Sequence, residues 1–158
     1  MTTLDQGMHV NTISHRVLRD QYLSEFSTFE IRQAIANLVE ANRIDLANAL
    51  SAAGQSLFPE SEEILVISAL LAEIQQDWTG AEKMLRKIVC AQGAAATPST
   101  WHHLIRVLRC QFETGEALEI AQLAIKAYPS NLTLNEEFLQ LQELLTKKDS
   151  LSSVNKSH

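Results

Sequence analysis

Three small residues recur at nearly equal spacing along the chain, and this spacing limits the folds that the chain can adopt. Ala47 and Ala81 are separated by 34 residues (81 − 47), and Ala81 and Ala117 by 36 (117 − 81). A repeat of about 34 residues is typical of stacked helix–turn–helix units. The two additional residues fit best in residues 91–97, AQGAAAT, because an insertion there lengthens a loop and leaves the core register intact.

Apolar residues with helical spacing surround each of these alanines, which predicts three helix pairs. The predicted units are residues 28–59, 62–93 and 98–129, and their second helices begin near Ile44, Trp78 and Thr114. Pro59 and Pro129 each follow a second helix and end it, because proline lacks the N–H group that a continuing helix needs. The sequence therefore predicts an all-α protein.

The third unit carries the most specific pattern. It has Trp101, Leu104, Ile105 and Leu108 on its first helix, followed by Ala117, Ala121, Ala124 and Pro129. This pattern resembles the tetratricopeptide repeat (TPR), although Ile105 replaces a small residue of the family pattern and the second unit lacks a closing proline. The resemblance implies an α-solenoid of about three TPR-like repeats that binds other proteins and has no catalytic activity.

The two ends of such a stack need caps, because each unit buries its apolar face only against a neighbour. We predict an N-terminal arm, residues 1–27, with an amphipathic helix that carries Ile13, Val17, Leu18, Tyr22 and Phe26. The repeat domain then spans residues 28–148 and ends in a capping helix, residues 135–147, whose apolar stripe is Leu134, Phe138, Leu141 and Leu145. Residues 149–158 are polar and are predicted to be a disordered tail.

Composition and charge exclude several classes of protein. The net charge of −6 argues against a nucleic-acid-binding protein, which usually has a basic surface. No apolar stretch approaches the ~20 residues of a membrane-spanning helix, and Met1–Val10 lacks the charged start of a signal peptide. We therefore expect a cytoplasmic protein without membrane insertion. Cys90 and Cys110 are expected to be buried free thiols.

The sequence offers no motif for a cofactor, a metal ion or catalysis. Its five glycines are scattered singly, so there is no phosphate-binding loop. His102 and His103 are adjacent and point about 100° apart on a helix, so they cannot hold one metal ion together. Glu136 and Glu137 are most simply solvated charges at a helix start. We expect no enzyme activity, no cofactor and no metal.

The resemblance implies that the first helices of the repeats line a concave groove that holds the ligand. The corresponding positions are Phe29, Arg32, Ala36 and Val39 in the first unit, Glu63, Val66, Leu70 and Glu73 in the second, and Ser99, His102, Arg106 and Arg109 in the third. The expected partner is a peptide or helix of another protein, with apolar side chains in one half and an acidic group near the arginines.

One ligand of the family is argued against by the sequence. Relatives that hold the C-terminal carboxylate of heat-shock chaperones use Lys, Asn and Arg side chains in this groove. Arg32 could supply one cation, but Ala36 and Ile67 stand where polar residues are expected. That clamp is incomplete.

Two alternatives to a generic binding module stay open. The size, the N-terminal helix, the three repeats and the cap are similar to the cytosolic chaperones of type III secretion, which hold an export substrate soluble. Alternatively, the chain is a structural subunit that forms a homodimer through its N-terminal helix. This helix would then mediate association instead of capping the stack.

Overall fold

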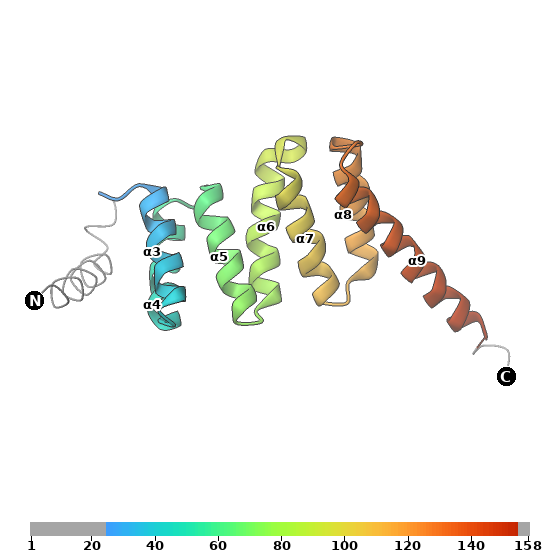
Figure 1. Cartoon of the computed structure of the whole chain (residues 1–158), viewed down its shortest axis with the longest axis horizontal. Helices are drawn as coiled ribbons and strands as arrows, with labels where there is room; N and C mark the ends of the chain where they lie inside the picture. The colour runs from blue at the N-terminus through green and yellow to red at the C-terminus, as the bar shows by residue number, and fades with distance from the viewer. Residues whose placement is uncertain (1–24, 155–158) are drawn as a thin grey trace, which may run out of the picture. The chain divides into compact units, whose positions relative to one another are not determined.

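The computed structural model describes residues 25–154, and within this range the chain is helical and has no strand. The helices, labelled as in Figure 1, are α3 (Thr28–Glu40), α4 (Ile44–Leu57), α5 (Glu62–Ile74), α6 (Trp78–Gln92), a short 3₁₀ helix η1 (Gly93–Ala95), α7 (Pro98–Cys110), α8 (Thr114–Ala127) and α9 (Leu132–Val154). The prediction of an all-α fold is confirmed. Each of the six helices from α3 to α8 also begins at the residue that the sequence pattern predicted.

Polar side chains at the N-caps explain why the first helices of the units begin where they do. The backbone N–H of Glu30 donates to the Ser27 hydroxyl (3.2 Å), and the Glu30 carboxylate accepts from the Ser27 backbone (2.8 Å), which completes a capping box. The hydrogen bond from the Ser27 backbone, and then that from its hydroxyl, lowers the pKa of Glu30. The side chains of Ser61, Thr97 and Asn131 each accept one backbone N–H at the starts of α5, α7 and α9, without the reciprocal bond of a capping box.

The turns between the two helices of each repeat share one backbone conformation. Asn42, Gln76 and Phe112 have positive φ angles of 55°, 60° and 63°. Their spacing equals that of the three alanines, so the turn recurs with the repeat. Asn tolerates this left-handed region well, whereas a bulky residue such as Phe112 is rare in it. The Phe112 side chain is 88% exposed, so it gains little packing in exchange for the backbone strain.

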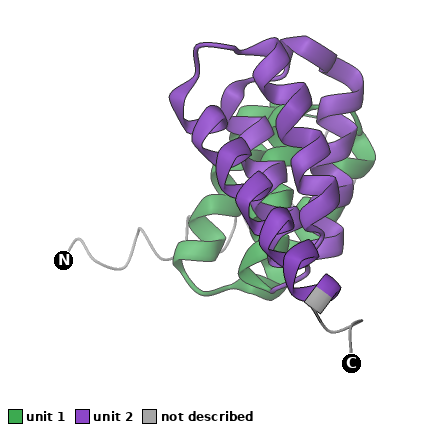
Figure 2. Ribbon diagram, turned by 90° about the vertical axis from the view of Figure 1, so that its right-hand side faces the viewer, with its two compact units in different colours: residues 1–75 green, residues 76–158 purple. Residues whose placement is uncertain are grey.

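The chain divides into two compact units, residues 1–75 and 76–158, which Figure 2 colours separately. The boundary lies between α5 and α6, within the second predicted repeat. Unit 1 therefore contains α3, α4 and α5, and unit 2 contains α6 to α9.

In unit 1, α5 packs against both α3 and α4. The core contains Ile31, Ile35, Ala47, Leu50, Ile64 and Leu71. Ala47 is fully buried, as expected for a small residue where two helices cross. Gly54 on α4 lies so close to α3 that a Cβ atom there would be 3.3 Å from the Ile31 Cγ2. A buried hydrogen bond, from Ser51 Oγ to Ser68 Oγ (2.7 Å), joins α4 to α5.

In unit 2, α7 packs against α6 and α8, and α9 packs mainly against α8. The core is formed by Leu85 of α6, Leu104 and Leu108 of α7, and the fully buried Ala81 and Ala117. The predicted insertion in residues 91–97 forms the end of α6 and the 3₁₀ helix. The Tyr128 hydroxyl donates to the carbonyl of Ala96 (2.9 Å) and so fixes this insertion against the end of α8.

The capping helix is longer than the sequence predicted. α9 continues to Val154, so the prediction that a disordered tail begins at residue 149 is wrong for residues 149–154. The hydroxyls of Ser150, Ser152 and Ser153 donate to backbone carbonyls three residues earlier (2.8–2.9 Å), which keeps these polar residues within the helix. No glycine or proline follows Pro129 to end it. The predicted N-terminal helix, apart from Phe26, and residues 155–158 lie outside the described residues.

The two cysteines are free thiols, but the prediction that they are buried is wrong. Cys90 follows the buried Ile88 by two residues, and Cys110 follows the buried Leu108 by two residues. Two residues turn a helix by about 200°, which carries both side chains to the exposed face.

Candidate partner-binding surfaces

In unit 1, the first helices α3 and α5 pack against each other and leave apolar side chains exposed. Their N-terminal ends are joined by a hydrogen bond from the Thr28 hydroxyl to the Glu63 carboxylate. Phe29 on α3 is 56% exposed, and Leu70 on α5 is 39% exposed. Val66, Leu70 and Ile74 follow one another every four residues along α5, and Ile74, which the sequence analysis did not select, is 57% exposed. We call Phe29, Val66, Leu70 and Ile74 the unit 1 surface.

The other predicted groove residues of unit 1 differ in their exposure. Arg32 is exposed, and Glu73 is half-buried. Val39 is half-buried and packs against the unit 1 core, so it offers a partner less surface than predicted. Ile67 packs against the same core, and Ala36 is half-buried.

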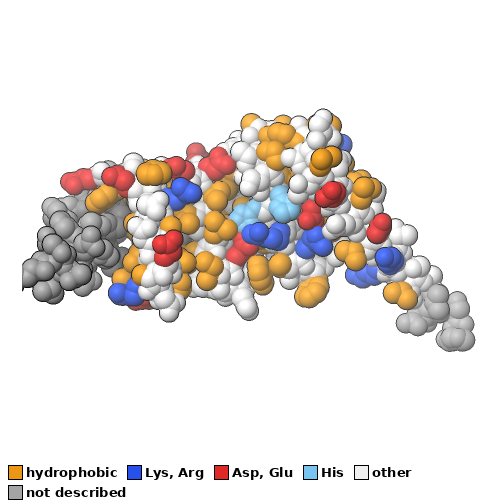
Figure 3. All heavy atoms as spheres, in the orientation of Figure 1, with side chains coloured by type: hydrophobic (Ala, Val, Ile, Leu, Met, Phe, Trp, Pro, Cys, Tyr) orange, Lys and Arg blue, Asp and Glu red, His pale blue; other side chains and the backbone are white. Residues whose placement is uncertain are grey.

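In unit 2, the predicted basic residues of α7 lie next to a carboxylate of α9. Glu137 Oε2 is 2.6 Å from Arg109 Nη1, and Glu137 Oε1 is 3.3 Å from His102 Nε2. The Glu137 side chain is only 17% exposed, so the expectation that it is a solvated charge is wrong. Arg106 is exposed, and Figure 3 shows basic, histidine and acidic side chains gathered over α7 and α9. We call His102, Arg106 and Arg109 the unit 2 basic cluster.

The pairing with Glu137 could have been found by extending the repeat. Adding 34 residues to the start of α7 at Pro98 gives Leu132, where α9 begins. α9 therefore occupies the place of the first helix of a fourth repeat. First helices of successive repeats are neighbours in this architecture, and Glu137 consequently lies beside His102 and Arg109.

A second group of charges in unit 2 links α6, α7 and α8. Arg86 contacts the carboxylates of Glu82 (2.6 Å) and Glu116, and the Gln111 amide donates to Glu82 (2.7 Å). Burial raises the pKa of Glu82, but the hydrogen bonds from Arg86 and Gln111 outweigh burial and lower it overall. The hydrogen bond to Glu82 raises the pKa of Arg86. These contacts hold the helices together.

The histidines and acidic residues of the described range do not gather into a metal-binding arrangement. His103 is buried in α7, and no group of three or more His, Cys, Asp or Glu side chains in the described range could hold a metal ion. Within the same range, no helix is both long and apolar enough to cross a membrane.

Comparison with known proteins supports the fold. No family model matches the sequence, and no curated protein matches it significantly. Among solved structures, the chain is similar to the first TPR domain of Spaghetti (RPAP3), solved with the HSP90 peptide SRMEEVD. The TM-score is 0.63 at 12% identity, over 75% of this chain and 93% of that domain. The helices of this chain therefore have the TPR-like repeat fold that the resemblance implied.

Proposed function

We propose that this chain is a non-catalytic binding module that holds a peptide or helix of another protein against the first helices of its repeats. The unit 1 surface carries this proposal. Phe29, Leu70 and Ile74 are exposed on two helices that pack against each other. A group of exposed apolar side chains typically marks an interaction site. The RPAP3 domain, which has the same fold, holds a peptide, and this supports the proposal.

The spacing along α5 indicates what kind of segment the unit 1 surface accepts. Val66, Leu70 and Ile74 form one apolar stripe, which suits the apolar face of an amphipathic helix or alternate side chains of an extended peptide. Covering an exposed leucine contributes roughly 1.5–3 kcal/mol when burial is complete. In unit 2, an acidic group of the partner would approach Arg106 and compete with Glu137 for His102 and Arg109.

Affinity capture from the native cell extract tests the unit 1 surface. We expect Leu70→Glu to lose the captured partner, because a charge would be placed where apolar side chains meet. Leu57→Glu is the matched control, since Leu57 is also 39% exposed but lies on the second helix α4. Both variants should keep the helical circular dichroism signal. Retention of the partner by Leu70→Glu, or equal loss in both variants, would contradict the proposal.

The peptide SRMEEVD provides a second test of specificity. Ala36 and Ile67 lack the polar groups of the carboxylate clamp, and Ile67 is partly buried against the unit 1 core. We therefore expect no saturable binding of fluorescently labelled SRMEEVD in an anisotropy titration. Saturable binding that Arg32→Ala abolishes would show that the clamp works despite these substitutions.

A further inference from the structure

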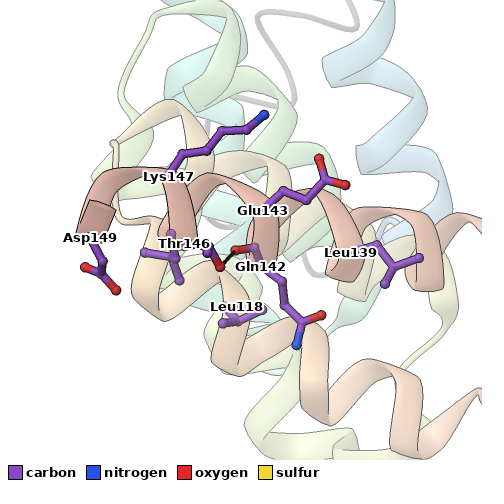
Figure 4. A pocket seen from close by; sticks show the side chains of 8 residues that line it. Leu118, Leu139, Gln142, Glu143, Thr146, Lys147 and Asp149 are labelled. Carbon is purple, nitrogen blue, oxygen red and sulfur yellow. Dashed lines mark hydrogen bonds between the residues drawn. The ribbon is translucent and has the colours of Figure 1, made fainter. Parts of the chain in front are cut away.

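Hollows lie on the surface of both units, and they differ in their chemistry. The hollow along α9 in unit 2, of about 620 Å³, is lined by Glu143, Lys147 and Asp149 together with other polar residues and three leucines (Figure 4). Its charges of both signs favour no one kind of occupant. The hollow along α3 in unit 1, of about 270 Å³, is lined by Phe26, Phe29, Glu30, Ile31, Gln33, Ala34 and Asn37, which we call the α3 hollow.

The polar side chains of the α3 hollow already have hydrogen-bond partners. The Gln33 amide donates to Asn37 Oδ1 (3.2 Å). The Glu30 carboxylate accepts from the backbone N–H of Ser27 (2.8 Å) and from its hydroxyl (2.9 Å). An occupant of the hollow would therefore be held mainly by the apolar side chains.

The α3 hollow runs along the side of α3 that is turned away from the unit 1 core. Ile35 is fully buried in the core, whereas Gln33 and Asn37, two residues before and after it, are exposed. Two residues turn a helix by about 200°, so these side chains lie on opposite sides. Phe29, which is 56% exposed, and the half-buried Ala34 add apolar surface to the hollow.

The chain joins α3 directly beside this hollow. Phe26 precedes the N-cap Ser27 and packs against the core that contains Ile31, the fourth residue of α3. This is the arrangement of a hydrophobic staple, which fixes the angle at which a chain enters a helix. Glu25 and Phe26 form a turn and a bend, so the segment before them can run back along α3.

Residues 12–24 match the α3 hollow in length and in pattern. This segment has 13 residues (24 − 12 + 1), as α3 does, and both would span about 20 Å as helices. On the helix that the sequence predicts, Arg16 and Leu23 lie on one side. The apolar face on the other side consists of Ile13, Val17, Leu18 and Tyr22.

We propose that residues 12–24 form a helix that runs antiparallel to α3 and covers the α3 hollow of the same chain. Leu18 is six residues before Ser24, and Ala34 is six residues after Thr28, so Leu18 comes level with Ala34. The covalent connection at Glu25 gives the segment a high effective concentration at its own hollow, which favours this contact over one with a second copy.

The proposed contact leaves most of the partner-binding site open. Phe29 alone belongs both to the α3 hollow and to the unit 1 surface, so Val66, Leu70 and Ile74 stay available to a partner. The N-terminal helix would thus cap unit 1 instead of mediating a homodimer.

Cysteine crosslinking in the full chain tests the contact. Cys90 and Cys110 are exposed and are first replaced by serine. Leu18→Cys/Ala34→Cys should then react with a short bismaleimide within one chain about tenfold faster than Arg16→Cys/Ala34→Cys, because Arg16 lies on the other side of the predicted helix. Intact mass spectrometry measures the rates and separates a crosslinked monomer from a crosslinked dimer. Circular dichroism verifies that each variant is folded.

Two further substitutions test whether the apolar face makes the contact. In the Leu18→Cys/Ala34→Cys chain, Val17→Glu should slow the crosslink about fivefold or more, since it places a charge against the hollow. Leu23→Glu is the matched control and should leave the rate unchanged. The proposal is overturned if both cysteine pairs react equally fast, or if Val17→Glu and Leu23→Glu act alike. A product that consists mainly of crosslinked dimers also overturns it, because the helix would then cover a second copy.

Discussion

Units 1 and 2 are built on the same helix–turn–helix register but are held together by different contacts. Unit 1 joins its helices through apolar packing, a close approach at Gly54 and one buried bond between Ser51 and Ser68. Unit 2 adds ion pairs that connect α6 with α8 through Arg86 and α7 with α9 through Arg109. The first helices of unit 1 expose apolar side chains, whereas His102 and Arg109 of the unit 2 basic cluster are paired with Glu137 within the unit. The repeated positions thus determine where the helices lie. The residues between them determine which side chains stay exposed to a partner.

The largest expected effect comes from core substitutions that lower the unfolding free energy of one unit and not of the other. Ile35→Ala in unit 1 should cost about 2–5 kcal/mol of unfolding free energy, because the side chain is fully buried. Both tryptophans, Trp78 and Trp101, belong to unit 2, so their fluorescence reports that unit alone. In urea, we expect the midpoint from circular dichroism to fall more than the midpoint from fluorescence. Leu104→Ala should move the fluorescence midpoint, and equal shifts of both probes in both variants would show that the units unfold together.

The buried serine pair of unit 1 should give the next largest effect. Ser68→Ala removes the acceptor of the Ser51 hydroxyl in a buried position, and this should cost about 1–3 kcal/mol. The double variant Ser51→Ala/Ser68→Ala should cost less than the sum of the two single variants, because no hydroxyl is then left unpaired. Urea unfolding followed by circular dichroism measures all three, and additive costs would contradict the hydrogen bond.

Two glycines compare the packing of second helices in the two units. Gly115→Ala in α8 should stabilise the chain by about 0.5–1 kcal/mol, because a Cβ atom there would meet no other atom within 4 Å. Gly54→Ala in α4 should give a smaller gain or a loss, since its Cβ would be 3.3 Å from Ile31 and 3.4 Å from Ile64. The thermal midpoints of the two variants measure the difference. A larger gain at Gly54 would show that unit 1 is less tightly packed than the structure indicates.

The smallest expected effect is on the pH dependence of the unfolding free energy of unit 2. The pKa of Glu82 is lowered from its ordinary value of 4.5, so Glu82 stabilises the folded state above that pH. This stability is lost as the pH falls through the lower pKa of the folded state. Between about pH 6 and pH 3, the wild type should lose up to about 1 kcal/mol more than Glu82→Gln, as measured by urea unfolding with tryptophan fluorescence. An equal loss in both would exclude this role of Glu82.

The sequence predicted where the helices begin better than it predicted where α9 ends or which side chains are exposed. The starts of α3 to α8 were predictable, because the apolar spacing repeats and residues such as Ser27 and Thr97 cap helices locally. The full burial of Ala47, Ala81 and Ala117 also follows from the spacing. The extension of α9 was not predictable, because serines are weak helix formers whose hydroxyls can bond to the helix carbonyls.

The candidate surfaces were less predictable than the fold. Phe29 and Leu70 lie exposed on α3 and α5, at positions taken from the repeat pattern. The pairing of Glu137 with Arg109 becomes predictable only when the repeat is extended to α9, because local sequence alone does not bring α9 beside α7. The exposure of Val39 likewise depends on how deeply α3 sits in the unit 1 core.

The exposed thiols of Cys90 and Cys110 make the natural sequence suitable for site-directed spectroscopy. The sequence has no other cysteine, and these two lie on α6 and α7, which pack against each other within unit 2. A nitroxide or fluorophore pair can therefore be attached to this helix pair without any engineered substitution. Changes in the label separation would then report directly whether ligand binding moves α6 relative to α7.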